Sequence, residues 1–121
     1  MLNETLLERY ERARMFFEAK DFVMASTLLA ELVEDAPEEA SVRLLLARAY
    51  FHSAQLTRAE RELRITLERD PVDDYAHLLL GRTLERQSRH GDAARHLRIA
   101  EAMSGVSSAG LLSANGHLIL S

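Results

Sequence analysis

The chain has 121 residues, of which 47% are hydrophobic and 28% charged, and its net charge at pH 7 is −4. These values are typical of one ordinary globular domain, and they argue against a protein whose affinity rests on neutralising nucleic-acid phosphates. The absence of cysteine excludes disulfides and thiolate zinc sites. The N-terminal stretch MLNETLLERYERAR carries charges where a signal peptide needs an apolar core, and no apolar run approaches the length of a membrane span, so we expect a cytoplasmic protein.

The first half of the chain predicts three helices. Apolar residues at helical spacing run from about Leu6 to Lys20, and Asp21 is suited to cap a second helix over about residues 22–35. We expect Pro37 in the first turn of a third helix, since proline fits that position and the acids that follow it suit the positive end of the helix dipole.

The second half predicts three more helices. Thr57 and Glu60 have the spacing of a capping box at the start of the fourth helix. In the stretch DPVDD we expect Asp70 to cap the fifth helix and Pro71 to lie in its first turn, with Gly91 separating it from the sixth. The sequence therefore predicts six helices joined by short turns.

The sequence repeats itself at a fixed period. The stretches YERARMFFEAKDFVMASTLL, LLLARAYFHSAQLTRAEREL and LLLGRTLERQSRHGDAARHL begin at positions 10, 44 and 78, so that the same spacing separates each from the next without a gap. Their alignment gives two columns of small residues, which are Ala13, Ala47 and Gly81, and Ala25, Ala59 and Ala93. A glycine inside a helix costs about 1 kcal/mol relative to alanine, so we expect another helix to pack closely on Gly81.

This spacing, with its small-residue columns and with Pro37 and Pro71 one period apart, resembles the tetratricopeptide repeat family, whose unit is about 34 residues long. The resemblance implies an all-α, right-handed α-solenoid of three helix-turn-helix repeats, at about residues 6–39, 40–73 and 74–107. These repeats form a domain over residues 1–107, followed by a cap or flexible tail over residues 108–121. The sequence departs from the family pattern where Arg9, Arg43 and His77 replace an early tryptophan, and where Gly105 replaces a proline.

The resemblance also implies that the first helix of each pair lines a concave binding surface. The candidate groove residues are Tyr10, Arg14, Phe17, Leu44, Leu45, Arg48, Phe51, Tyr75, Leu78, Leu79 and Arg82. Three of them are arginines spaced one period apart, and guanidinium groups bind carboxylates in two-point geometry beside rigid aromatic contacts. The alternative is that these arginines only pair with acids on their own helix, as Arg14 can with Glu11 or Glu18.

Chaperone-binding members of the family grip terminal carboxylates with lysine, asparagine and arginine at set groove positions. The matching positions here are Tyr10, Arg14, Leu45, Tyr75 and Leu79. Only Arg14 is suited to that role, so we expect no clamp of this kind.

Catalysis receives little support from the sequence. The five histidines form no HExxH motif, and none has a nucleophile partner. We expect neither an enzyme nor a bound metal or cofactor. The favoured interpretation is a non-catalytic adaptor or chaperone-like module that binds an apolar peptide carrying carboxylates, with no nucleic acid or membrane as partner.

The C-terminal segment leaves an alternative open. Residues 102–121 contain no Asp, Glu, Lys or Arg, yet they include five large aliphatic residues, which are Leu111, Leu112, Leu118, Ile119 and Leu120. This segment is interpreted as a cap around Ser107 to Ser113, as a disordered end, or as an apolar strap that fills its own groove or a neighbour's. The alternative function is a structural protein that forms homo-oligomers through this tail and the last repeat.

Overall fold

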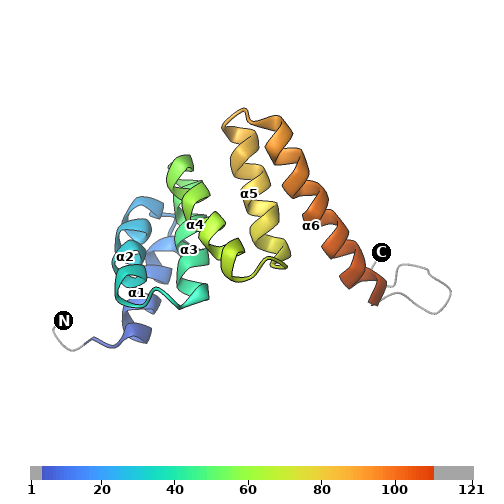
Figure 1. Ribbon diagram of the computed structural model, residues 1–121. Helices are drawn as coiled ribbons and strands as arrows, with labels where there is room; N and C mark the ends of the chain where they lie inside the picture. Colours follow the sequence, from blue (N-terminus) through green and yellow to red (C-terminus); the bar gives the residue numbers. More distant parts are fainter. Residues whose placement is uncertain (1–3, 111–121) are drawn as a thin grey trace.

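The computed structural model describes residues 4–110, and the side chains of residues 4–104. It contains the predicted six helices, and no strand occurs in the described part of the chain. The helices are α1 (Leu6–Glu18), α2 (Phe22–Asp35), α3 (Ala40–His52), α4 (Leu56–Arg69), α5 (Asp74–Arg86) and α6 (His90–Gly110). Each helix packs against the next along the chain, so the three pairs follow one another in a single row with residues 4 and 110 at opposite ends (Figure 1).

Side-chain caps explain where several helices begin. Thr5 caps α1 in a capping box with Glu8, which was not predicted. The Asp21 carboxylate accepts a hydrogen bond of 3.1 Å from the backbone N–H of Met24 and caps α2, as predicted. Helix α1 begins at Leu6, also as predicted, whereas the predicted starts of the helices after α2 are wrong. Pro37 lies in the turn before α3, which begins at Ala40.

The cap of α5 is Asp73, whose carboxylate accepts a 2.9 Å hydrogen bond from the Ala76 N–H. Asp70 instead ends α4, and Pro71 lies in the turn that follows. The unpaired N–H groups of α5 come only after this turn, so the aspartate next to them caps the helix. Two further expectations also fail. The side chain of Thr57 makes no capping box because α4 already begins at Leu56, and Gly91 lies inside the first turn of α6.

The turn inside each helix pair repeats with the sequence period. The only non-glycine residues with positive φ in the described chain are Lys20 (66°), Ala54 (61°) and Ser88 (63°), and each follows the one before it by one period. At each of these turns, the left-handed backbone conformation lets the chain reverse its direction within a few residues. This conformation is unfavourable for a residue that carries a Cβ. The same local geometry therefore builds all three pairs.

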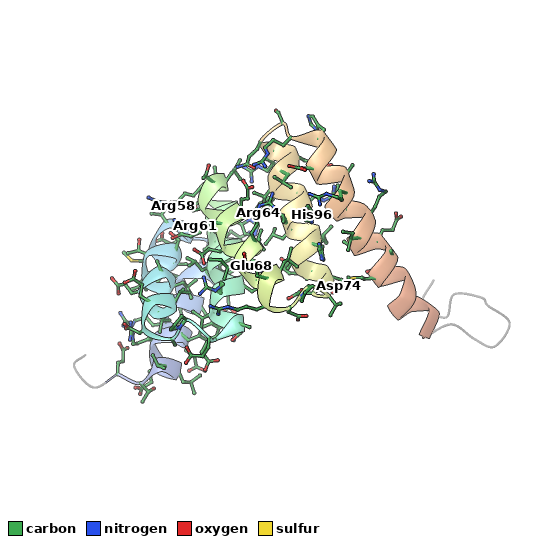
Figure 2. All side chains as sticks on the ribbon, viewed as in Figure 1. Arg58, Arg61, Arg64, Glu68, Asp74 and His96 are labelled. Carbon is green, nitrogen blue, oxygen red and sulfur yellow. The ribbon has the colours of Figure 1, made fainter. Side chains whose placement is uncertain are left out.

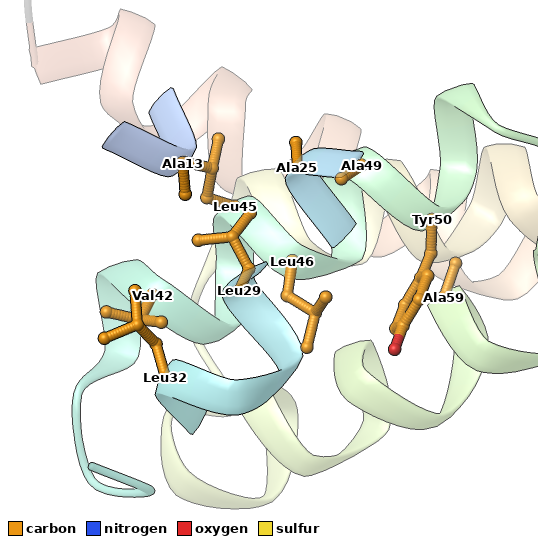
Figure 3. Close-up of a cluster of buried hydrophobic side chains, with 10 residues drawn as sticks. All are labelled: Ala13, Ala25, Leu29, Leu32, Val42, Leu45, Leu46, Ala49, Tyr50 and Ala59. Carbon is orange, nitrogen blue, oxygen red and sulfur yellow. The ribbon is translucent and has the colours of Figure 1, made fainter. Parts of the chain in front are cut away.

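The hydrophobic core runs between the helix pairs. One cluster joins the first two pairs and contains Leu29, Leu32, Leu46 and Tyr50 among its buried members (Figure 3). A second cluster joins the last two pairs. All six small-column residues are buried, which confirms that they pack the helices together.

A buried ion pair accompanies this core. The Arg43 guanidinium on α3 lies 2.6 Å from the Glu62 carboxylate on α4 and also donates a 3.1 Å hydrogen bond to the carbonyl oxygen of Pro37. Side chains further along α4, including Arg64 and Glu68, extend on the side where His96 lies (Figure 2).

The last helix is longer than expected. Helix α6 continues through Gly110, beyond the predicted end of the third unit at residue 107. Residues 108–110 therefore belong to a helix, whereas the rest of the expected cap or tail, residues 111–121, lies outside the described residues.

Candidate functional site: the first-helix face

Helices α1, α3 and α5 are connected along one face by two contacts between arginines and aromatic rings. The guanidinium carbon of Arg48 on α3 lies 4.8 Å from the centre of the Phe17 ring on α1. The guanidinium carbon of Arg86 on α5 lies 4.8 Å from the centre of the Phe51 ring on α3. Arg86 also donates a 3.0 Å hydrogen bond to the Phe51 carbonyl oxygen. Such cation–π contacts stabilise the arginine in place over the ring.

More aromatic side chains gather at the same end of α3. The His52 ring stacks on Phe22 with 4.7 Å between ring centres, and Phe17 meets Phe22 edge to face at 5.1 Å. Together these residues form what we call the arginine–aromatic cluster: Phe17, Phe22, Arg48, Phe51, His52 and Arg86. The cluster presents flat apolar surfaces beside guanidinium groups, a combination suited to binding an apolar chain that carries carboxylates.

The electrostatic environment of this cluster is positive. The pKa of His52 is lowered from its ordinary value, first by burial and then by the positive charges of Arg48, Arg86 and Lys20. This positive environment favours a negatively charged ligand at this position.

The three arginines of the predicted column have different surroundings. Arg14 pairs with Glu18 at 2.8 Å, and Arg82 pairs with Glu85 at 3.1 Å, each on its own helix. Arg48 has no ion pair within the described residues, and its buried Nε atom has no hydrogen-bond partner there. The middle arginine is therefore the one whose charge is not already neutralised.

The structure does not bring the other predicted groove residues into this cluster. Leu45 and Leu79 are buried in the core, and Leu44 packs partly against the second core cluster. Tyr10 lines a separate groove of about 270 Å³ beside the start of α3.

Three predicted residues face the end of the row of helices instead. Tyr75, Leu78 and Arg82 line a groove of about 590 Å³ together with side chains of α6 that include Ala94 and Leu97. Tyr75 and Leu78 are exposed. We call this the α5–α6 end groove.

Sequence reasoning missed three members of the cluster. Arg86 was detectable because it lies one helical turn after Arg82, on the same side of α5. His52 was detectable as the neighbour of Phe51 at the end of its helix. Phe22 had no signal, because it belongs to the second helix of its pair and reaches the cluster only through the tight turn at Lys20.

Other kinds of site find no support in the described part of the protein. No group of three or more His, Asp or Glu side chains lies together there in an arrangement that holds a metal ion. None of the described helices combines the length and apolarity needed to cross a membrane.

Solved structures with the same fold include MamA from Desulfovibrio magneticus RS-1, with a TM-score of 0.79 and 23% identity over 85% of this chain and 58% of that chain. MamA MSR-1 gives a TM-score of 0.79 at 19% identity, over 85% of this chain and 59% of that one. A chain of the CopN–Scc3 complex gives 0.76 at 20% identity, over 81% and 58%. This chain thus spans a little under three fifths of those chains, and at these identities the similarity shows the fold alone.

No similarity to a curated protein sequence reaches significance. The sequence profile described as tetratricopeptide repeat matches residues 16–83, which is more than half of the chain. That match agrees with the period of the sequence, the six helices and the folds of the solved structures. The chain belongs to the tetratricopeptide repeat family, whose fold is generally a protein–protein interaction module.

Proposed function

We propose that this protein is a non-catalytic, cytoplasmic adaptor that binds a partner peptide across the first-helix face, with a carboxylate of the peptide paired to Arg48. The observation that carries the proposal is that Arg48, unlike Arg14 and Arg82, has no acidic partner within the described residues. A peptide carboxylate at this position gains charge-assisted hydrogen bonds without having to displace an existing ion pair.

The surroundings of Arg48 suggest what else the peptide carries. The Phe17 ring holds the guanidinium from one side, and Phe51 lies under Arg86 on the next helix. Aromatic and aliphatic side chains of a peptide would pack on these rings while its carboxylate meets Arg48. We therefore propose a peptide in which an Asp or Glu stands beside apolar residues.

The test is a selection of displayed random peptides on the purified protein. The peptides that bind the parent but do not bind the Arg48→Gln variant are sequenced. The circular dichroism spectrum of the variant is compared with that of the parent to confirm that the variant folds. We expect the retained peptides to be enriched in Asp or Glu next to large apolar residues. Retained peptides without acidic residues, or identical sets on both proteins, would contradict the role of Arg48.

A second candidate function is self-assembly, and the α5–α6 end groove favours it. This groove joins the exposed side chains of Tyr75 and Leu78 to the half-buried Leu97. The segment that follows α6 carries large aliphatic residues and no Asp, Glu, Lys or Arg, which matches such a surface. In this alternative, residues 111–121 of a second copy occupy the groove.

Light scattering on the full chain and on a chain shortened after Gly110 separates the two functions. Self-assembly predicts that the full chain has a multiple of the monomer mass and that the shortened chain is monomeric. The peptide-binding proposal predicts that peptides selected on the full chain still bind the shortened chain. A full chain that is monomeric at high concentration would contradict self-assembly.

A further inference from the structure

The second and third helix pairs contain equivalent buried polar pairs with different chemistry. In the second pair, Arg43 contacts the Pro37 carbonyl oxygen and the Glu62 carboxylate. At the equivalent positions of the third pair, His77 Nε2 lies 2.9 Å from the Pro71 carbonyl oxygen, and His77 Nδ1 lies 3.1 Å from His96 Nδ1. The chain thus keeps the same three-part connection but replaces an ion pair with two histidines.

The contacts determine which nitrogen of each ring carries the proton when both rings are neutral. A carbonyl oxygen only accepts, so His77 Nε2 carries a hydrogen and His77 Nδ1 is left as an acceptor. His96 Nδ1 must then be the donor to His77 Nδ1. His96 Nε2 then carries no hydrogen, and this buried acceptor has no hydrogen-bond partner among the described residues.

Both rings are buried, each with a relative exposure of 7%. They lie beside a cavity of about 290 Å³ between α4, α5 and α6, whose lining residues are Arg64, Leu67, Glu68, Pro71, His77, Leu80 and His96. Figure 2 labels Arg64, Glu68 and His96 among them. The charged groups that face the histidines are Arg64 and Glu68 from α4 and Arg95 and Asp92 from α6. Arg64 is already paired with Glu60 at 3.0 Å.

We propose that the His77–His96 pair is a proton-sensitive junction that weakens the packing of α5 on α6 below neutral pH, while the Arg43–Glu62 pair holds the second helix pair at all pH values near neutrality. The reason is geometric. When both rings are protonated, two N–H groups face each other across 3.1 Å with no acceptor between them. A proton on His96 Nε2 alone creates a buried cation among Arg64, Arg95, Glu68 and Asp92, and burial disfavours that charge.

The direction of the effect follows from the pKa of His96. Burial makes the largest contribution to lowering the pKa of His96, and interactions with Arg95, His77 and Arg64 lower it further. Asp92 acts in the opposite direction. An unfolded histidine titrates near pH 6.5, so below that value the unfolded chain gains the proton before the folded chain does. The stability that the neutral pair provides is therefore fully present above about pH 6.5 and declines as the pH falls towards the folded pKa.

The first test measures melting temperatures at pH 7.5 and 5.5, in the presence of a chelator so that metal binding does not contribute. The H77R/H96E variant transplants the pair found in the second repeat, and the H52Q variant controls for the other histidine whose pKa burial lowers. Lowering the pH from 7.5 to 5.5 should reduce the melting temperature of all three proteins. We expect the reduction for the parent and for H52Q to exceed that for H77R/H96E by about 4 °C or more. An equal loss in parent and H77R/H96E would overturn the proposal.

The second test uses the parent protein alone, so it does not depend on whether the variant folds. Nitrogen-15 NMR at pH 7.5 identifies the protonated nitrogen of each ring, and we expect Nε2–H for His77 and Nδ1–H for His96. On acidification, amide hydrogen exchange corrected for the intrinsic pH effect should accelerate in α5 and α6 before α3 and α4. Two Nε2–H rings, or exchange that accelerates evenly along the chain, would overturn the proposal.

Discussion

Leu97 of α6 lies directly over Gly81 of α5. A Cβ atom added to Gly81 would be 2.5 Å from Leu97 Cδ2 and 3.3 Å from the carbonyl oxygen of Ala93. Real Cβ atoms essentially never come that close, so a side chain at position 81 would force Leu97 to shift in the packed interface. The helix-propensity cost of this glycine is offset because α6 can approach closely enough to bury the neighbouring Leu80 and Leu84.

The Gly81→Leu substitution should therefore overpack this interface and destabilise the protein by about 1 to 3 kcal/mol or more. Urea unfolding and thermal unfolding, each followed by circular dichroism, measure the loss. Gly91→Ala is the matched control, because a Cβ at that position meets nothing within 4 Å. The control should be neutral or stabilising by up to about 1 kcal/mol. If Gly81→Leu melts within a degree or two of the parent, the close-packing explanation is wrong.

The buried ion pair gives a second prediction. Glu62→Ala leaves the Arg43 guanidinium buried without its carboxylate and should cost about 3 to 5 kcal/mol in the free energy of unfolding. The exposed pair of Arg14 and Glu18 is the comparison, and Glu18→Ala should cost less than about 1 kcal/mol. Chemical denaturation at pH 7.5 measures both. Similar losses from the two substitutions would show that burial of the pair does not control its contribution.

The positive φ of Ala54 gives a third prediction. Left-handed backbone costs an alanine about 1 to 2 kcal/mol, whereas glycine adopts it freely but loses about 0.5 to 1 kcal/mol through its larger freedom in the unfolded chain. Ala54→Gly should therefore be stabilising by up to about 1 kcal/mol, seen as a higher melting temperature. Ala102→Gly, at an exposed position within α6, should instead be destabilising. A lower melting temperature for Ala54→Gly would contradict this prediction.

The cap of α5 supplies a fourth prediction. Asp73→Ala removes the carboxylate that accepts the Ala76 N–H and should cost about 1 kcal/mol. Asp70→Ala tests the position that the sequence pattern had favoured, and it should change stability by a few tenths of a kcal/mol only, because its side chain caps no helix. Thermal unfolding of the two variants, measured side by side, distinguishes them. A larger loss of stability for Asp70→Ala than for Asp73→Ala would show that Asp73 is not the cap of α5.

The contrast between Asp73 and Asp70 illustrates what a sequence can and cannot predict. The period and the small columns predict the helix pairs and their packing, because residues such as Gly81 and Ala93 are selected by contacts that recur in every unit. Cap positions are predicted less well in a stretch like DPVDD, where several aspartates are equally suited to cap. Only the path of the turn decides which carboxylate reaches an unpaired N–H.

The candidate site was predictable in part for a similar reason. The spacing identified Arg48, Phe17 and Phe51, which share positions within the repeat. The sequence shows that an acid follows Arg14 and Arg82 by about one helical turn and that none follows Arg48. It does not show that an aromatic ring from another helix lies against the Arg48 guanidinium. The contact between His77 and His96 was not predicted, because a sequence column does not show that two side chains 19 residues apart meet in the core.

The central claim is that Arg48 binds a carboxylate of a partner peptide, and the affinity of one selected acidic peptide tests it most directly. Fluorescence polarisation gives its Kd for the parent, for Arg48→Gln, and for Arg14→Gln as the matched control on the same face. Losing a hydrogen bond to a charged group costs about 1.5 to 3 kcal/mol, so we predict that Arg48→Gln weakens binding about 10- to 100-fold while Arg14→Gln changes it by less than about threefold. Equal Kd values for the parent and Arg48→Gln, or a larger loss for Arg14→Gln, would contradict the claim.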